Sequence, residues 1–139
     1  MKPAFAYAPI ALAAALLSAC ATLPDAPIVS NGPALPVGSG VALGQPVEVA
    51  SNLVVTPMEV TEDSRCPINA RCIWPGQIVV QTRVDGAGWR ETVALTMGEP
   101  ASVRGRTVNL TSAEPGLMAG EEQGLPGNYR FTFEAGAAD

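Results

Sequence analysis

The period-two alternation of apolar and polar residues predicts an all-β fold for most of this chain. Short alternating segments are separated by glycine, proline and other turn residues, and none has the 3.6-residue period of an amphipathic helix. Such segments are typical of a small antiparallel sandwich or a partly open barrel. We expect about six or seven strands, preceded by a signal-peptide helix and a proline-rich tether.

The first element, residues 1–19, has the features of a secretory signal peptide. A lysine follows the initial methionine, the next stretch is uncharged and rich in alanine and leucine, and small residues stand directly before Cys20. A membrane-spanning helix would need about 20 apolar residues, and two prolines interrupt this stretch. A buried core helix would have little to pack against, because proline-rich sequence follows it.

The Leu17-Ser18-Ala19-Cys20 run resembles the lipobox of bacterial lipoproteins. The resemblance implies cleavage before Cys20 and acyl chains on Cys20 that hold the protein on a membrane. Two or three acyl chains meet the requirement of two signals for stable anchoring. In proteobacterial lipoproteins an aspartate after the cysteine retains the protein at the inner membrane. Ala21 takes that position here, which implies the outer membrane and its periplasmic face.

The rest of the chain divides into a tether and one domain. Residues 20–40 are expected to be the lipidated cysteine and a flexible tether, since proline, glycine, alanine and serine dominate there without periodicity. Residues 41–135 are expected to form the β-domain, and one domain suits a chain of 139 residues. The expected strands are residues 47–49, 54–60, 78–84, 89–97, 108–110 and 129–133.

Turns and strand faces follow from the same pattern. Pro57 lacks the N–H of a strand ladder, which predicts an edge position or a bulge. Residues 85–88 predict a hairpin loop, because their glycines accept positive φ. Arg83 is expected opposite the apolar face of its strand, and Arg90 is expected on the wet face of the return strand. Residues 112–127 contain two prolines and four glycines and predict a long loop.

Charge and composition exclude several kinds of function. The chain has 8 basic and 13 acidic residues and a formal net charge of −5, so we expect no nucleic-acid partner. It has no histidine, which is the commonest general base and metal ligand. A Ser-His-Asp triad is therefore excluded and most zinc sites are disfavoured. We expect no enzyme, no cofactor and no metal site.

Cys66 and Cys72 are expected to form a disulfide, because an export signal places the pair in an oxidising compartment. The bridge would close a loop of seven residues, and such a loop stabilises the fold by about 2 kcal/mol on chain-entropy grounds. A redox role fits the sequence less well. Redox dithiols are close-spaced at a helix N-terminus, whereas five residues separate this pair in a strand-rich context.

The sequence around these cysteines resembles a motif in a family of small, uncharacterised bacterial lipoproteins. The motif is Asp-Ser-Arg-Cys-Pro after an acidic residue (63–67), then a spacer and Cys-x-Trp-x-Gly (72–76). Pro75 stands where the family usually has alanine. The resemblance extends over most of residues 41–134, and it implies a β-rich domain on a lipid anchor, with no known activity. It is also carried by residues 44–45, 58–60 and 129–133.

Asp63, Arg65, Arg71 and Trp74 are the candidate binding residues, and two interpretations of them stay open. In the structural one, Asp63 accepts N–H bonds at a turn, Arg65 pairs with a carboxylate, and the disulfide pins a crossover between two strands. In the functional one, the rigid loop presents Arg65, Arg71 and Trp74 to a partner. Arginine and tryptophan are favoured at interaction hot spots, and binding residues are frequent on loops.

The sequence therefore predicts a lipid-anchored, non-enzymatic envelope lipoprotein that serves as a structural or protein-interaction module. Its expected partners are the membrane, through the lipid on Cys20, and an envelope protein. The alternative is a lipoprotein that binds a small ligand or a cation. Calcium takes about six to eight oxygen ligands. Candidate carboxylates are those of Glu59, Glu62, Asp63, Glu121 and Glu122, although a solvated acidic surface is the default interpretation.

Overall fold

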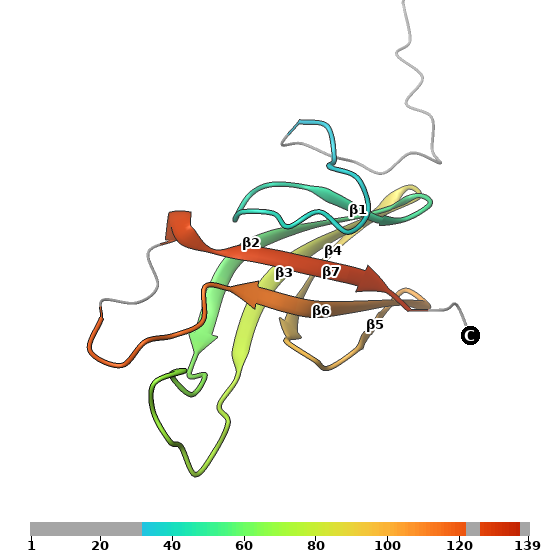
Figure 1. The fold of residues 1–139 in the computed structure, drawn as a ribbon. Coiled ribbons are helices and arrows are strands. Elements are labelled where there is room, and N and C mark those ends of the chain that lie inside the picture. Colours follow the sequence, from blue (N-terminus) through green and yellow to red (C-terminus); the bar gives the residue numbers. More distant parts are fainter. Residues whose placement is uncertain (1–31, 122–125, 137–139) are drawn as a thin grey trace, which may run out of the picture.

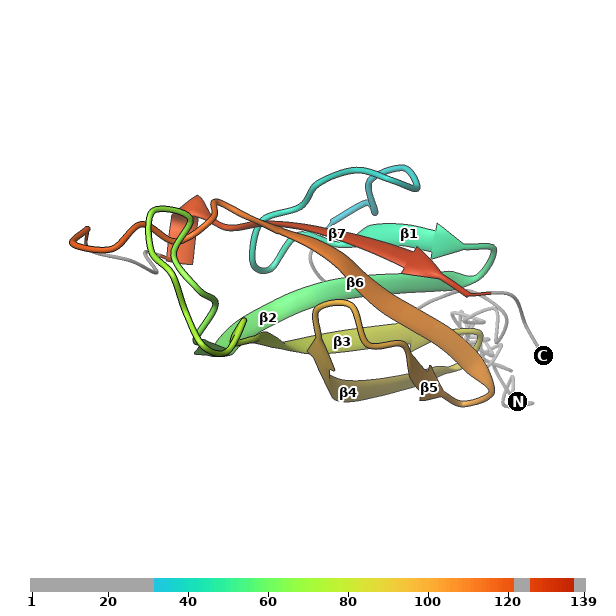
Figure 2. The ribbon, with the colours of Figure 1, turned by 60° about the horizontal axis from the view of Figure 1, so that its bottom comes forward.

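A computed structural model of the chain describes residues 32–121 and 126–136, and the expected signal peptide and Cys20 lie outside this part. The described residues form seven β-strands in two antiparallel sheets, which confirms the predicted all-β class. The three-stranded sheet crosses over the four-stranded one, and the two are not closed into a barrel (Figure 1, Figure 2). Within the described ranges no helix is long and apolar enough to cross a membrane.

The strand order is β1-β2-β3-β4 in one sheet and β5-β6-β7 in the other, with every pairing antiparallel. A single 3₁₀ turn, η1, precedes β7 in this part of the chain. The bounds are β1 Val47–Ala50, β2 Leu53–Asp63, β3 Ile78–Gly86, β4 Trp89–Thr96, β5 Ala101–Val103, β6 Arg106–Glu114, η1 Pro126–Asn128 and β7 Arg130–Ala135.

The hydrophobic core lies between the facing sides of the two sheets. Alternate residues of β3, namely Ile78, Val80 and Val84, are fully buried, as their spacing predicted. Phe131 and Phe133 of β7 are buried against this face from the other sheet. Because a fully buried side chain of this size contributes about 1.5–3 kcal/mol, these alternating residues fix which face of each strand points inward.

A β-bulge lies at Pro57 in β2, as its missing N–H predicted. The register between β2 and β3 shifts between Pro57 and Glu59. The ladder between β1 and β2 ends opposite Val55, so Pro57 lies past the end of β1. Its carbonyl oxygen instead accepts the N–H of Gly44 at 2.7 Å.

The segment before β1 adds one backbone pairing to each sheet. Leu35, in the segment expected to be a tether, pairs in parallel with Val47 of β1. Val41 pairs antiparallel with Phe131 of β7. Strand-like pairing therefore starts at Leu35, ahead of the first expected strand.

Two strands differ from the expected pattern. β6 runs to Glu114, so the long loop expected over residues 112–127 begins only after that residue. A bulge between Leu110 and Ser112 resets the alternation and returns Ala113 to the buried face, which the sequence pattern does not reveal. β5 was not expected, because three residues are too few to establish a period.

The hairpin between β3 and β4 contains a cluster of charged residues, two of which are buried. Its turn consists of Ala87 and Gly88, since β3 extends two residues further than expected. Asp85 is fully buried and Arg83 is 8% exposed, although Arg83 lies opposite the apolar face of β3 as expected. The Asp85 carboxylate accepts from Nε of Arg83 at 3.1 Å and from Nε of Arg90 at 2.5 Å. The three charged groups share one face of the sheet, where one carboxylate pairs with two guanidinium groups.

Candidate functional site

Residues 64–77, which join β2 to β3, form a loop that we call the cystine loop. It projects from the end of the molecule opposite to the end at which β7 stops (Figure 1, Figure 2). The disulfide Cys66–Cys72 closes it, with the two Cα atoms 5.9 Å apart, which confirms the predicted bridge. The four candidate binding residues lie in this loop or at its base.

The two ends of the cystine loop continue the β2–β3 ladder. The N–H of Ser64 donates to the carbonyl of Gln77, and the N–H of Cys66 donates to that of Pro75, both at 2.8 Å. Gly76 has φ +66° and lies so close to Ser64 that an added Cβ would be 1.8 Å from its carbonyl oxygen. The loop can therefore close only with glycine at position 76.

Arg65 ties the cystine loop to the three-stranded sheet. Its guanidinium donates to both carboxylate oxygens of Asp63 at 2.8 Å, in a bidentate pair. The remaining donors reach the carbonyl oxygens of Ala113 at 2.7 Å and Pro115 at 3.0 Å. The side chains of Arg65 and Asp63 are 11% and 10% exposed, so this rigid fork braces the loop away from bulk water.

Tyr129 completes the polar network beneath the loop. Its hydroxyl donates to Oδ2 of Asp63 at 2.8 Å. Burial and this bond to a carboxylate raise the pKa of Tyr129 to about 12. Burial raises the pKa of Asp63, but the bonds from Arg65 and Tyr129 outweigh it and hold that pKa below its usual value. Asp63 is therefore a charged acceptor at neutral pH.

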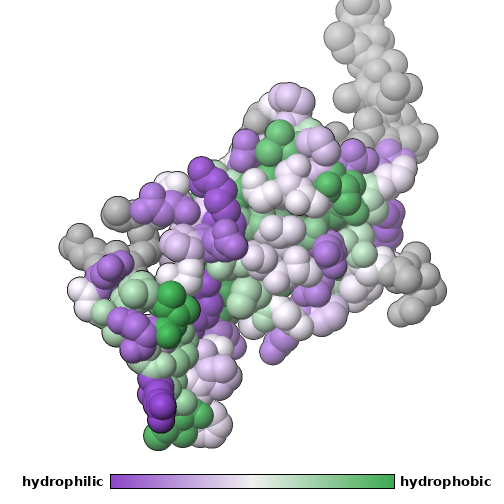
Figure 3. All heavy atoms as spheres, viewed as in Figure 1, coloured by the Kyte–Doolittle hydropathy of each residue, from purple (hydrophilic) through white to green (hydrophobic). Residues whose placement is uncertain are grey.

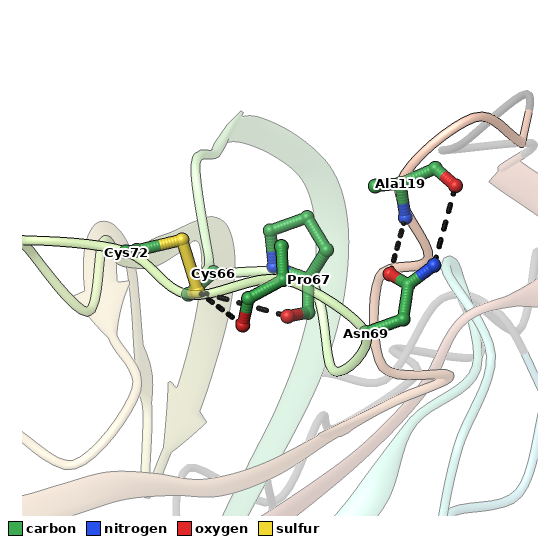
Figure 4. The surroundings of a disulfide bond; sticks show 6 residues. Cys66, Pro67, Asn69, Cys72 and Ala119 are labelled. Carbon is green, nitrogen blue, oxygen red and sulfur yellow. Dashed lines mark hydrogen bonds between the residues drawn. A yellow bond between two sulfur atoms is a disulfide. The ribbon is translucent and has the colours of Figure 1, made fainter.

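Glu62 and Asn69 add further braces on either side of the disulfide. Glu62 accepts from Nε2 of Gln77 at 2.9 Å and from Oγ of Ser64 at 2.8 Å, and these two bonds lower its pKa. Asn69 makes two hydrogen bonds with the backbone of Ala119, in the loop that follows β6 (Figure 4). Two segments far apart in the sequence are thereby held together.

The far end of the cystine loop presents large apolar side chains to solvent. Ile73 is 92% exposed, Trp74 is 79% exposed and Ile68 is 75% exposed. Hydrophobic and hydrophilic side chains lie side by side at this end of the molecule (Figure 3). Arg71 is exposed between these residues along the chain. We call Ile68, Arg71, Ile73 and Trp74 the apolar tip.

The structure divides the four candidate binding residues into two pairs. Asp63 and Arg65 bind each other and the backbone, so their hydrogen-bonding groups serve the fold. Arg71 and Trp74 lie at the apolar tip, and no hydrogen bond or ion pair of either side chain occurs with the described residues. Sequence reasoning missed Asn69 and Tyr129, because no local pattern predicts a contact with a residue 50 or more positions away in the sequence.

A hollow of about 430 Å³ lies beside the network, at the end of β2. Asp63 and Tyr129 form part of its wall, and the carboxylates of Glu59 and Glu62 make it acidic. No group of three or more histidine, cysteine, aspartate or glutamate residues within the described ranges could hold a metal ion. The lining residues are Leu43, Glu59, Val60, Thr61, Glu62, Asp63 and Tyr129.

The fold and the loop together define a β-sandwich-like domain that carries a braced, disulfide-closed loop. The chain matches no protein-family model, no curated protein and no solved structure. Its function must therefore be inferred from its own side chains.

Proposed function

We propose that this protein is a lipid-anchored lipoprotein of the bacterial envelope, facing the periplasm and most simply placed at the outer membrane. It acts as a non-enzymatic module that binds an envelope protein through the apolar tip. The signal-like residues 1–19 and Cys20 support the anchor, and the geometry of the cystine loop supports the binding role. The observation that carries this proposal is the exposure of Ile73 and Trp74 on a loop whose backbone is fixed by a disulfide and by hydrogen bonds.

The bracing distinguishes the apolar tip from a mobile surface loop. A disulfide, the Arg65 fork and the Asn69 contacts fix the backbone before any partner arrives. Preorganised contacts lose less conformational entropy on binding. Exposed large apolar side chains carry no benefit for the isolated fold, whereas tryptophan and arginine are the favoured hot-spot residues of protein interfaces. The tip therefore has the composition and the rigidity of a binding surface.

The experiment is in-cell crosslinking of the full chain, followed by affinity capture and mass spectrometry. The double variant Ile73→Ser with Trp74→Ser removes the apolar tip. Val37→Ser is the matched control, because Val37 is also an exposed aliphatic residue, at 60%, and lies outside the cystine loop. We expect one envelope protein to be captured by the natural chain and by the control, and lost with the double variant. Capture that is equal in all three chains, or absent from all, would overturn the proposal.

A second candidate function is the binding of a small cationic ligand in the acidic hollow. The specific observation is that a cavity of about 430 Å³ adjoins Glu59, whose carboxylate makes no hydrogen bond or ion pair with the described residues. Thermal unfolding with added small primary amines tests it. We expect a rise in Tm that is abolished by Glu59→Gln. The control variant Glu48→Gln, at an exposed position of β1, should preserve the rise. No change in Tm with any cation would remove this candidate.

A further inference from the structure

The outer edge of β4 is open, in contrast to the other sheet edges in the described part of the chain. Leu35 covers the edge of β1, since its N–H donates to Pro46 and its carbonyl accepts from Glu48, both at 2.9 Å. Val41 covers the edge of β7 through two bonds with Phe131. β5 has only three residues. β4 has eight residues, and the described chain places no paired strand on its outer side.

The ladder between β3 and β4 shows which backbone groups face outward. The N–H of Met97 donates to the carbonyl of Ile78, so this pair is hydrogen-bonded. Hydrogen-bonded and non-hydrogen-bonded pairs alternate along an antiparallel ladder, and the register is continuous from here to the hairpin. Thr92 and Ala94 consequently belong to non-hydrogen-bonded pairs, and their N–H and C=O groups point away from β3. No bond to these outward groups occurs among the described residues.

At its centre, β4 lacks the features that usually prevent edge pairing. Natural edges are protected by proline, charged side chains, bulges or a covering segment. β4 has no proline and no register shift against β3. Its charged residues, Arg90 and Glu91, lie near the hairpin, where Arg104 bonds Glu91 and lies over the ring of Trp89. Thr92 and Ala94 are small and exposed, so their side chains leave room for an approaching strand. The edge is therefore regular and accessible at its centre.

We propose that this edge pairs with β4 of a second copy of the chain, antiparallel and about a two-fold axis at Val93. In this register the backbone N–H and C=O of Thr92 form hydrogen bonds with the C=O and N–H of Ala94 in the second copy. Ala94 of the first copy pairs with Thr92 of the second in the same way. The four-stranded sheets of the two copies then form one continuous sheet. The contact uses no residue of the cystine loop, so it is independent of the proposed partner binding.

Charge selects the antiparallel arrangement of two copies. The two-fold places Arg90 opposite Thr96 of the second copy and Glu91 opposite Leu95. A parallel pairing would instead set Arg90 beside Arg90 and Glu91 beside Glu91, and like charges directly opposite each other destabilise a sheet. Glu91 is already neutralised by Nε of Arg104 at 3.0 Å. The two-fold arrangement thus sets no like charges directly opposite each other.

Disulfide trapping of the full chain in its membrane tests the register. In the proposed dimer Val93 lies opposite Val93 of the second copy in a non-hydrogen-bonded pair, where Cα atoms are about 4.5 Å apart and a disulfide can form. We expect Val93→Cys to give a crosslinked dimer on mild oxidation. Ser102→Cys, on the exposed part of β5, is the matched control, and the unsubstituted chain controls for Cys20. A yield from Val93→Cys no higher than from Ser102→Cys overturns the proposal.

A second substitution tests whether the backbone edge carries the contact. Ala94→Pro removes only an outward N–H, so the β3–β4 ladder is kept, and we expect it to lower the Val93→Cys crosslink to the level of the control. If this variant does not fold, Thr92→Lys with Ala94→Lys places ammonium groups opposite each other across the two-fold. A crosslink that persists in the folded variant overturns the proposal. A product with the mass of a different protein shows that the edge serves another occupant, which also overturns it.

Discussion

The guanidinium of Arg65 donates to a carboxylate at the end of β2 and to two carbonyl oxygens at the end of β6. A single side chain thereby joins both sheets and the cystine loop. Its planar fork matches the carboxylate of Asp63 in a way that lysine cannot reproduce. Loss of this residue would leave Asp63 and the carbonyls of Ala113 and Pro115 without their partner in a poorly hydrated place.

Arg65→Met is expected to lower the free energy of unfolding by about 2–3 kcal/mol, less than for a fully buried pair, because the site is slightly exposed. Arg65→Lys keeps the positive charge but not the planar fork, so it should lower the free energy of unfolding by an intermediate amount. The exposed Arg71→Met is the control and should change stability by less than about 0.5 kcal/mol. Urea denaturation measures all three. Equal midpoints for Arg65→Met and Arg71→Met would show that the network does not brace the fold.

The network also makes stability depend on pH at both extremes. The pKa of Tyr129, about 12, exceeds the ordinary value of about 10. Its contribution is therefore complete below pH 10 and is lost as the pH rises toward 12. The lowered pKa of Asp63 acts in the opposite direction: its contribution is complete above its ordinary pKa of about 4 and is lost on acidification below that value.

Titration of tyrosinate absorbance checks this dependence. We expect an alkaline transition near pH 12 that is absent from Tyr129→Phe. Asp63→Asn removes the carboxylate charge, so it should shift the Tyr129 transition to lower pH. A Tyr129 transition that is unchanged in Asp63→Asn would contradict the assigned cause.

At the scale of elements, the cystine loop is a long connection between β2 and β3 held in one conformation by contacts at both ends and at the side. Its base continues the strand ladder, its middle is bridged by Cys66–Cys72, and Asn69 attaches it to the loop after β6. Long connections in small domains are otherwise among the least stable parts of a fold. Because of these contacts, we expect this loop to unfold together with the two sheets.

Gly76→Ala should disrupt the base of the loop far more than an equivalent change elsewhere. Gly76 and Gly105 have similar positive φ values, +66° and +74°. A Cβ at Gly76 meets the carbonyl of Ser64, whereas a Cβ at Gly105 meets nothing within 4 Å. Gly105→Ala should therefore lower the free energy of unfolding only through backbone strain, by about 1–2 kcal/mol. Gly76→Ala should lower it by clearly more. Similar denaturation midpoints for the two variants would show that the backbone at Gly76 does not lie close to the carbonyl of Ser64.

At the scale of the whole molecule, three surfaces have separate tasks in our proposals. The N-terminal cysteine attaches the protein to a membrane, the apolar tip binds a partner, and the edge of β4 joins two copies. The tip and the β4 edge belong to different parts of the fold, so each can be removed by substitution without the other. Copies with a net charge of −5 repel one another, so pairing at β4 should strengthen as salt screens that repulsion.

Cys20→Ser is expected to release the protein from membranes or to leave its signal peptide uncut, because no residue remains to carry the lipid. Membrane fractionation and the mass of the chain measure both outcomes. Cys66→Ser with Cys72→Ser is the control, since it removes cysteines without touching the anchor, and it should stay with the membrane. A Cys20→Ser chain that is cut and still fractionates with the outer membrane would show that the lipid is not the anchor.

The sequence by itself determined the all-β class, the buried face of β3, the bulge at Pro57 and the disulfide Cys66–Cys72. Each of these follows from local facts: a period of two, a missing N–H, or two cysteines in a chain whose first residues resemble an export signal. The sequence also singled out the segment that became the cystine loop, because unusual residues are concentrated there.

Only the tertiary structure decided what those residues do. Arg65 was a candidate contact for a partner, yet it faces Ala113 and Pro115, and Asp63 meets Tyr129 across 66 positions of the chain. The burial of Arg83 beside Asp85 and the open edge of β4 were equally hidden. Such features depend on which distant segments fold against each other. Local alternation predicts which face of a strand points inward, but it does not reveal which other segments of the chain pack against that strand.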